Sequence, residues 1–379
     1  MLAPLAAGGP HTMTVQGATL LTIADVLVGE VWLASGQSNM ARTLGDEGDA
    51  ARTTEHPTLR FLTTHPGKGG TTGEWKSFTP TDGPAMSAVA FHFAHELQEK
   101  LRVPVGMVIG AQGSVFIQRW FDPQVEPADP GMKRGGDLFQ GYLAAVVPYA
   151  VRGAIWYQGE ADARAGYDRV YQQRLIALVR YWRRTWQRPQ LPFLIVQLPN
   201  TGPLQSDVDQ ETAGWPLVRN AQRLALALPG TALAVGIDIG DGKVHPSHKQ
   251  PFGYRLSLAA RALAYGEKGL VYAGPLYASS IVAGRTVRVR FTQVGGGLVA
   301  KGGALTGFAI AGADGHWAWG EATIAGDTVT VTSPAVAAPT QVRYAWAANP
   351  LFNLFNAEGL PASPFQTSEP APGPAEGIP

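Results

Sequence analysis

The sequence of 379 residues contains no cysteine. This absence excludes a disulfide framework, thiol catalysis and cysteine-based zinc sites, although it leaves the cellular compartment open. Long apolar runs are also missing, because no segment approaches the roughly 18 to 20 residues that cross a bilayer as a helix. The charges nearly cancel, with 30 Lys and Arg against 29 Asp and Glu. We therefore expect no nucleic acid and no membrane surface as a partner, and a neutral substrate as the default.

What the chain does contain is 45% hydrophobic residues, enough for a large domain and a smaller one. Short apolar runs predict strands buried on both faces at 26–34, 103–109, 154–157, 193–198 and 233–237. Amphipathic segments between them predict helices at 85–101, 137–149, 167–186, 217–228 and 250–265. This alternation predicts an α/β unit with a five-stranded, parallel, doubly wound sheet. In such a sheet the ligand site lies at the carboxyl ends of the strands.

The pattern changes after about residue 270, where short alternating runs separated by glycine clusters predict an antiparallel β domain. We expect four parts: a β segment at 1–25, the α/β unit at 26–272, the β domain at 273–368 and a disordered tail at 369–379. The alternating segment 12–23 predicts a hairpin that packs on the β domain. The first ten residues have no basic region and too short an apolar core for a signal peptide.

Ser38 lies in the motif Gly36-Gln37-Ser38-Asn39-Met40, directly after the first predicted strand. A hydroxyl at the end of a buried strand, beside a glycine that permits a sharp bend, is typical of a nucleophile. Because such a turn is more often structural, Ser38 needs partners from other strand ends. The candidates are Gly113 after the second strand, Gln158 and Glu160 after the third, and Asp238, Asp241 and His245 after the fifth. This set predicts acyl transfer, with a nucleophile, a base, an orienting carboxylate and oxyanion donors.

Three motifs resemble blocks of the sialate O-acetylesterase family, within the SGNH hydrolases. They are Gly36 to Met40, Trp156-Tyr157-Gln158-Gly159-Glu160, and Val244-His245-Pro246 with Lys249, and the likeness extends from about residue 5 to 368. It implies a flavodoxin-like SGNH fold and a carbohydrate acetylesterase that acts on sialic acid, xylan or other plant glycans without a cofactor. It also implies that 1–25 is the remnant of an N-terminal β domain. A periplasmic or secreted location is implied as well, with the cytoplasm as the alternative because no signal peptide is evident.

The resemblance also implies roles for individual residues. Ser38 is the nucleophile and His245 the base, while the backbone N–H groups of Ser38 and Gly113 and the amide of Gln158 form the oxyanion hole. Gln37 and Asn39 are supporting residues. The third triad member is open, because the wider superfamily has an acid three residues before the histidine, where this chain has Gly242. We expect Asp241 in this role, with Asp238, Glu160 or a backbone carbonyl as alternatives.

Two other functions compete with an esterase. Asp238, Asp241, His245 and His248 are closely spaced oxygen and nitrogen ligands, which suit a divalent metal that activates water. The missing acid at Gly242 and the β domain would also suit a non-catalytic glycan-binding protein on an esterase scaffold. Trp120 and Trp215, in loops near strand ends, are candidates for stacking on a sugar ring. Nothing in the sequence indicates the oligomeric state.

Overall fold

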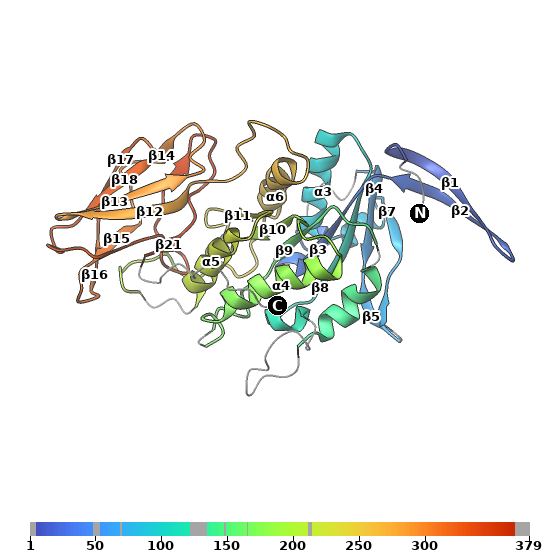
Figure 1. Cartoon of the computed structure of the whole chain (residues 1–379), viewed down its shortest axis with the longest axis horizontal. Coiled ribbons are helices and arrows are strands. Elements are labelled where there is room, and N and C mark those ends of the chain that lie inside the picture. The colour runs from blue at the N-terminus through green and yellow to red at the C-terminus, as the bar shows by residue number, and fades with distance from the viewer. Residues whose placement is uncertain are drawn as a thin grey trace.

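The computed structural model describes residues 5–47, 54–68, 70–121, 135–147, 149–164, 166–210 and 214–367. Along its longest axis, Figure 1 shows an N-terminal hairpin, then a central α/β unit, then a group of β sheets. The tail expected at 369–379 lies outside the described residues, as do the first four residues of the expected β segment.

The central sheet has seven strands in the order β11-β10-β9-β3-β8-β4-β7. Their bounds are Glu30–Gly36 (β3), His56–Thr63 (β4), Trp75–Phe78 (β7), Val105–Ala111 (β8), Gly153–Tyr157 (β9), Phe193–Val196 (β10) and Thr231–Ala234 (β11). The five predicted strands are adjacent and parallel, but the expectation of only five strands in a wholly parallel sheet is wrong. Strand β4 pairs in parallel with β8, and β7 pairs antiparallel with β4 at the sheet edge. Because β4 and β7 are only partly buried, they lack the continuous apolar runs that mark the others.

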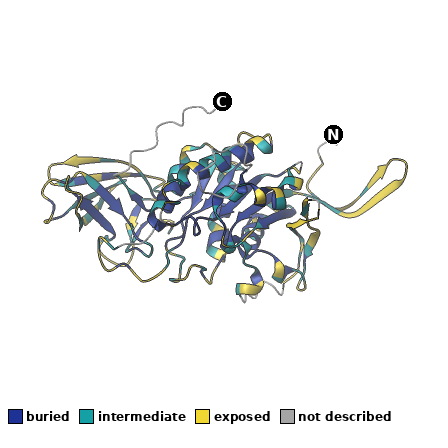
Figure 2. Ribbon diagram, turned by 90° about the horizontal axis from the view of Figure 1, so that it is seen from below, coloured by how far each residue is buried: buried dark blue, intermediate teal, exposed yellow. Residues whose placement is uncertain are grey.

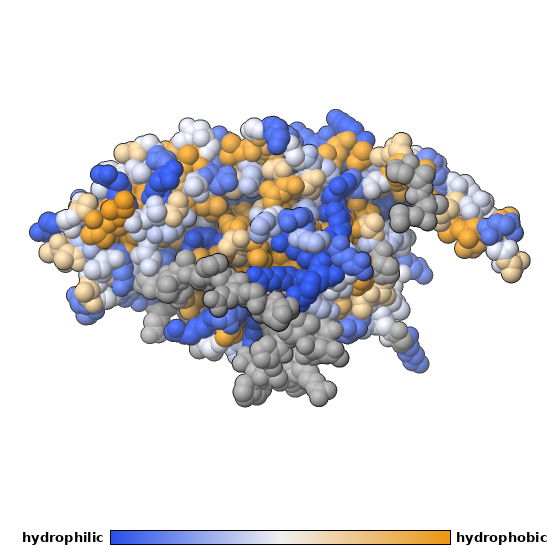
Figure 3. All heavy atoms as spheres, in the orientation of Figure 1, coloured by the Kyte–Doolittle hydropathy of each residue, from blue (hydrophilic) through white to orange (hydrophobic). Residues whose placement is uncertain are grey.

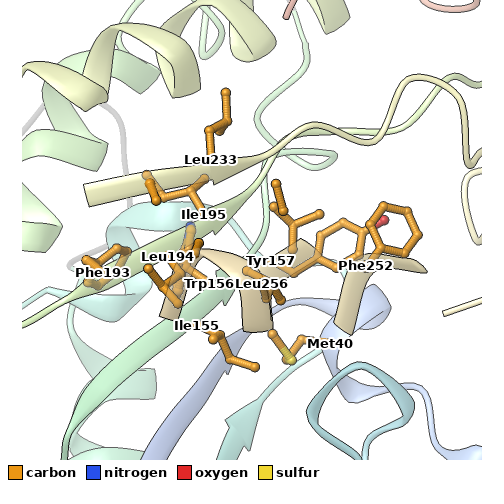
Figure 4. Close-up of a cluster of buried hydrophobic side chains, with 14 of the residues drawn as sticks. Met40, Ile155, Trp156, Tyr157, Phe193, Leu194, Ile195, Leu233, Phe252 and Leu256 are labelled. Carbon is orange, nitrogen blue, oxygen red and sulfur yellow. The ribbon is translucent and has the colours of Figure 1, made fainter. Parts of the chain in front are cut away.

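Helices cover the sheet in two packed pairs, α3 with α6 and α4 with α5. The bounds are Ala88–Leu101 (α3), Tyr171–Thr185 (α4), Trp215–Leu224 (α5) and Gln250–Leu263 (α6), and α5 continues into the 3₁₀ turn η6 at Ala225–Ala227. Figure 2 shows the strands of the central sheet as the most buried part of the unit. Figure 4 shows Tyr157 of β9 beside Phe252 of α6, and the centres of the two rings are 5.3 Å apart. Burial on both faces explains why these strands have uninterrupted apolar sequences.

Short helices fill the connections between the larger elements. They are α1 at Ser38–Ala41, α2 at Leu44–Glu47, η2 at Gly83–Ala85 and η3 at Ile117–Trp120. The helix expected at 137–149 is instead a π turn at Phe139–Leu143 (η4) followed by a 3₁₀ turn at Ala144–Val146 (η5). Gly141 lies in the middle of η4, where a β-carbon would stand 3.1 Å from Pro66. Glycine has a low helix propensity. The amphipathic pattern that predicted a helix at 137–149 does not take this propensity into account.

The C-terminal part consists of antiparallel β structure, as expected. One sheet contains Leu276–Ala283 (β12), Thr286–Thr292 (β13), Thr328–Thr332 (β18) and Glu321–Ala325 (β17), and a second contains Trp317–Trp319 (β16), Phe308–Ala311 (β15), Gln341–Tyr344 (β19) and Phe365–Gln366 (β21). Leu298–Ala300 (β14) pairs with Leu354–Asn356 (β20). Burial alternates along β13 and β18, which matches the alternating apolar residues in their sequences.

Arg219 joins the α/β unit to the C-terminal part. Its fully buried guanidinium donates hydrogen bonds to four backbone carbonyls, those of Leu198, Pro199, Ala347 and Ala348. Burial lowers the pKa of Arg219 to about 9. The two parts are therefore packed through a polar seam that the sequence pattern did not indicate.

The N-terminal hairpin pairs β1 (Gly8–Gln16) with β2 (Leu20–Val28). It projects from the α/β unit at the end opposite the C-terminal sheets, so the expected packing on the β domain does not occur (Figure 1). Leu20 and Leu21 are more than half exposed, and hydrophobic atoms are visible on this hairpin in Figure 3. A second small hairpin, of β5 (His65–Gly67) and β6 (Gly70–Thr72), follows β4.

Candidate active site

A sharp turn at Gly36 positions Ser38 at the carboxyl end of the central sheet. Strand β3 ends at Gly36, which has a φ of 143°, and α1 begins two residues later at Ser38. The next N–H, that of Gln37, donates to the carbonyl of Tyr157 at 3.0 Å. The end of β9 therefore holds the turn from which Ser38 projects, as expected of a nucleophile at a strand-to-helix junction.

Ser38 and His245 are in hydrogen-bond contact, with 2.8 Å between Oγ and Nε2. Burial lowers the pKa of His245 below its usual value, and the positive charges of Arg42 and Lys249 lower it further. The imidazole is consequently neutral around neutral pH, which is the form that accepts a proton. A hydroxyl bonded to a neutral imidazole is the arrangement that activation of a nucleophile by a general base requires.

Gly113 lies against the same serine. A β-carbon at Gly113 would be 3.6 Å from Cβ of Ser38, so the loop after β8 passes close to this serine. Gln112 donates its N–H to the carbonyl of Gly36, which fixes this loop to the turn before Ser38. The structure thus brings together Ser38, His245 and Gly113 from three separate segments.

The side-chain amide of Gln158 is engaged in internal hydrogen bonds. Its side chain is fully buried, and Nε2 faces Asp162 Oδ2 at 2.5 Å, the Val115 carbonyl at 3.0 Å and Gln37 Oε1 at 3.2 Å. Two N–H groups facing three internal acceptors leave no donor for a substrate oxygen. Burial raises the pKa of Asp162 to about 7, opposed by the bonds from Gln158 and from Ile117. Among the described residues, no hydrogen bond links the Gln158 amide to Ser38.

The carboxylates expected to orient His245 bond elsewhere. Asp241 Oδ2 accepts from the Oγ of Ser247 at 2.7 Å, and both oxygens of Asp238 lie 2.6 Å from the guanidinium of Arg255. Partial burial alone would raise the pKa of Asp241, but the bonds from Ser247 and Lys243 lower it to about 2. In the described part of the chain, no hydrogen bond links either carboxylate to His245, and none reaches its Nδ1.

The metal cluster suggested by the sequence is not assembled. Asp238 is paired with Arg255, and His248 is exposed on the loop. Within the described ranges, no three His, Asp or Glu side chains gather in a way that would hold a metal ion. No helix within these ranges has the length and apolar character needed to cross a membrane.

A buried polar network lies directly beside Ser38. Asn39 Nδ2 donates to Glu160 Oε1 at 2.6 Å and to the Val244 carbonyl at 2.9 Å, while Lys249 Nζ donates to Asn39 Oδ1 at 2.5 Å. Gln37, expected as a supporting residue, accepts from the N–H of Ala161 through Oε1. The motif at 244–249 includes Lys249, but sequence reasoning assigned it no role. The one sequence feature that could have indicated a role for Lys249 was its position four residues after His245.

A cavity of about 520 Å³ lies next to α1. Its lining includes Ala41 of α1, Thr63 and His65 at the end of β4, Lys76 of β7 and Ala111 of β8. The tryptophans expected to stack on a sugar do not face solvent, because Trp120 is fully buried and Trp215 is 8% exposed. Both indole rings are part of the hydrophobic core instead.

Comparisons with known proteins agree with the motifs. A family model described as carbohydrate esterase, sialic acid-specific acetylesterase, matches residues 28–260. The crystal structure of a carbohydrate acetylesterase from Xanthomonas citri superposes with a TM-score of 0.89 and 39% identity, over 97% of this chain and 87% of that one. Sialate O-acetylesterases of Pongo abelii and Homo sapiens are each 30% identical over 331 residues, covering 73% of this chain. The match spans only 62% of the length of each of these two relatives. The chain belongs to the sialic acid-specific acetylesterase family of carbohydrate esterases.

Proposed function

We propose that this protein is a serine esterase that removes O-acetyl groups from carbohydrates. Ser38 Oγ attacks the acetyl carbonyl while His245 Nε2 takes its proton and passes it to the departing sugar hydroxyl. Water, activated by the same imidazole, then attacks the acetyl group on Ser38 and releases acetate. The observation that carries the proposal is the 2.8 Å contact between Ser38 and His245 at the carboxyl end of the sheet.

The oxyanion of each tetrahedral intermediate requires N–H donors. The backbone N–H of Ser38 opens α1, where the first N–H groups of a helix have no intrahelical acceptor. The N–H of Gly113 belongs to the loop in contact with Ser38, and the absence of a side chain there leaves room for an acetyl group. We assign both groups to the oxyanion hole. The internal bonds of Gln158 favour a structural role for its amide over the donor role that the resemblance implied.

His245 works in this proposal without a carboxylate partner. Asp241 is bonded to Ser247 and Asp238 to Arg255, which argues against either as the third triad member. Glu160 reaches the histidine loop only through Asn39. Sequence reasoning held a backbone carbonyl as an alternative to Asp241, but no hydrogen bond among the described residues reaches Nδ1, so we infer a Ser-His pair without a bonded third group.

The cavity beside α1 suits the sugar ring that carries the acetyl group. Ser38 and Ala41 are three residues apart in α1 and so lie on the same side of this single turn. Ala41 lines the cavity, and so does Ala111, which pairs with Gly36 at the start of the nucleophile turn. Thr63 and His65 supply hydroxyl and imidazole groups for the polar groups of a sugar, while Glu74 and Lys76, which is paired with Asp82, complete the charged part of the lining.

Arg42 favours an anionic sugar such as sialic acid over a neutral one. It follows Ala41 directly, and its charge lowers the pKa of His245, so the guanidinium is within electrostatic range of this imidazole. Within the described residues, Arg42 makes no ion pair. An unpaired guanidinium beside an ester site suits the carboxylate of a sialic acid. Acetylated xylan remains the second candidate substrate.

The finer description of the fold is also part of the proposal. Strands β8-β3-β9-β10-β11 correspond to the order 2-1-3-4-5 in sequence, which is the flavodoxin-like order, and their two helix pairs fit a doubly wound SGNH unit. We place this unit at 26–272 and the C-terminal β domain at 273–368.

The test uses the purified full chain with three substrates: p-nitrophenyl acetate, O-acetylated sialic acid and acetylated xylan. We expect release of acetate from the sialic acid, and a loss of at least about a thousandfold in kcat for Ser38→Ala. Ser279→Ala, an exposed serine of β12, is the matched control and should keep full activity. Activity that survives Ser38→Ala and disappears in a chelator would instead identify a metallohydrolase. Sugar binding without turnover in the wild-type protein would identify a glycan-binding scaffold.

A further inference from the structure

We propose that Lys249 is a positioning residue that, through Asn39, fixes the loop carrying His245 against the nucleophile turn. The inference rests on the proposed esterase activity and adds to it a residue that holds the base in place. Asn39 follows Ser38 directly in the chain, and it bonds to both ends of the segment 244–249. The segment is thereby closed into a loop whose two ends meet at the neighbour of the nucleophile.

The chemistry of the partners determines how the Asn39 amide is turned. Lys249 Nζ can only donate in its ammonium form, so it must face Oδ1, at 2.5 Å. The Glu160 carboxylate and the Val244 carbonyl can only accept, so both must face Nδ2, at 2.6 and 2.9 Å. If the amide were flipped, Oδ1 would face the two acceptors and Nδ2 would face the ammonium of Lys249. Both contacts would be repulsive. Lys249 and Glu160 therefore hold one orientation from opposite sides.

This orientation matters because, among the described residues, the bond to Ser38 is the one hydrogen bond that the His245 ring makes. Its Nε2 bonds to Ser38, while no hydrogen bond within the described ranges reaches Nδ1. The direction of the ring then depends on the backbone of residue 245. The bond from Asn39 to the carbonyl of Val244 fixes the peptide group immediately before that residue. Asn39 supports the imidazole through the backbone, where other esterases use a carboxylate.

The surroundings of Lys249 suit an ammonium held rigidly. The side chain is fully buried, and Nζ lies 5.8 Å from the centre of the Tyr157 ring and 5.9 Å from that of Phe252. Both distances are within the range of cation–π attraction. The charged groups that act on Lys249 are Glu160, Glu47, Arg42 and Asp241, and Lys249 in turn acts on His245. Burial lowers the pKa of Lys249 to about 8, against the raising influence of Glu160 and Glu47.

The experiment is a double-mutant cycle on hydrolysis of p-nitrophenyl acetate by the full chain. Lys249→Met keeps the length and apolar stem of the side chain but removes the donor. Because a misplaced catalytic group costs up to about a hundredfold, we expect kcat to fall roughly ten- to a hundredfold. KM should change by less than about threefold, since Lys249 does not touch the substrate in this proposal. Lys100→Met, an exposed lysine of α3, is the matched control and should behave as wild type.

The second arm separates positioning from general structural support. If Lys249 acts by placing His245, then adding Lys249→Met to His245→Ala should lower the residual rate by less than about twofold. The proposal would be overturned if Lys249→Met lowered the rate of the His245→Ala variant by the same factor as it lowers the rate of the wild type. Such a result would show that the effect of Lys249 is independent of the histidine. Wild-type kcat in Lys249→Met would overturn it as well. Should Lys249→Met fail to fold, Asn39→Ser takes its place in the same cycle with the same two criteria.

Failure of this inference is distinguishable from failure of the proposed function. Wild-type activity in Lys249→Met together with an inactive Ser38→Ala would reject the positioning role and leave the esterase standing. Wild-type activity in Ser38→Ala would reject both.

Discussion

The backbone of Gly36 lies so close to the carbonyl of Tyr157 that a β-carbon on residue 36 would stand 2.0 Å from the oxygen. Real β-carbons do not approach a backbone oxygen this closely, and neither backbone can retreat because both belong to the paired strands β3 and β9. The contact brings the end of β3 against the end of β9 and sends the chain into the turn that presents Ser38. A glycine is therefore required at this position for both a steric and a conformational reason.

Gly36→Ala should lower the free energy of unfolding by about 2 kcal/mol or more, because the clash adds to an unfavourable φ. Urea denaturation of the two proteins measures the difference. Gly284→Ala is the matched control, since its φ is also positive, at 61°, while no atom lies within 4 Å of the place that its new β-carbon would take. We expect it to cost about 1 kcal/mol. If the free energy of unfolding fell equally in the two variants, the contact with Tyr157 would add nothing to the cost of the unfavourable φ.

Removing the charge of Arg42 should change the pH dependence of activity in a defined direction. The base form of His245 is needed, so kcat/KM should rise with pH through the pKa of this histidine. Burial and the two neighbouring cations lower that pKa, so the proposed esterase should keep its activity below the pH range in which histidine usually titrates. In Arg42→Met one cation is lost, so the pKa rises and the acid limb of kcat/KM moves to higher pH. A profile recorded on p-nitrophenyl acetate tests this, and an unmoved or acid-shifted limb would contradict it.

Asp241→Asn should leave kcat within about threefold of wild type. When a carboxylate orients the catalytic histidine, its replacement by the amide typically lowers kcat by about ten-thousandfold. Asp241 instead accepts hydrogen bonds from Ser247, and an amide oxygen can accept the same bonds. Steady-state kinetics on p-nitrophenyl acetate distinguish the two cases clearly. A loss of a thousandfold or more would restore Asp241 as the third member of a triad.

Gln158→Ala should affect stability more than catalysis. The substitution deletes buried bonds to Asp162 and Val115, which should lower the free energy of unfolding by about 1 to 3 kcal/mol. Loss of an oxyanion donor would slow kcat by roughly a hundred- to a thousandfold, and we expect less than about tenfold. Urea denaturation and kinetics on the same preparation provide both numbers. A stable variant with a thousandfold lower kcat would place the amide in the oxyanion hole after all.

The central part of the fold could be predicted because its strands are buried on both faces. That environment demands the continuous apolar runs that end at residues such as Gly36 and Tyr157. Strand β7 at the sheet edge and β4 beside it are partly exposed, so their sequences are mixed and carry no such signal. The seam at Arg219 was equally invisible, because a single arginine in a helix gives no sign that four carbonyls surround it.

The sequence by itself determined the family and the residues most suited to attack and proton transfer, because motifs at strand ends reflect local backbone requirements. Ser38 in its glycine turn and His245 before a proline are recognisable without coordinates. Only the tertiary structure decided which polar groups meet. It turned Asp241 toward Ser247, buried the amide of Gln158 against Asp162, and closed the histidine loop on Asn39 with Lys249. Hydrogen bonds depend on distances of a few ångströms between segments far apart in the chain, and loop backbones set those distances.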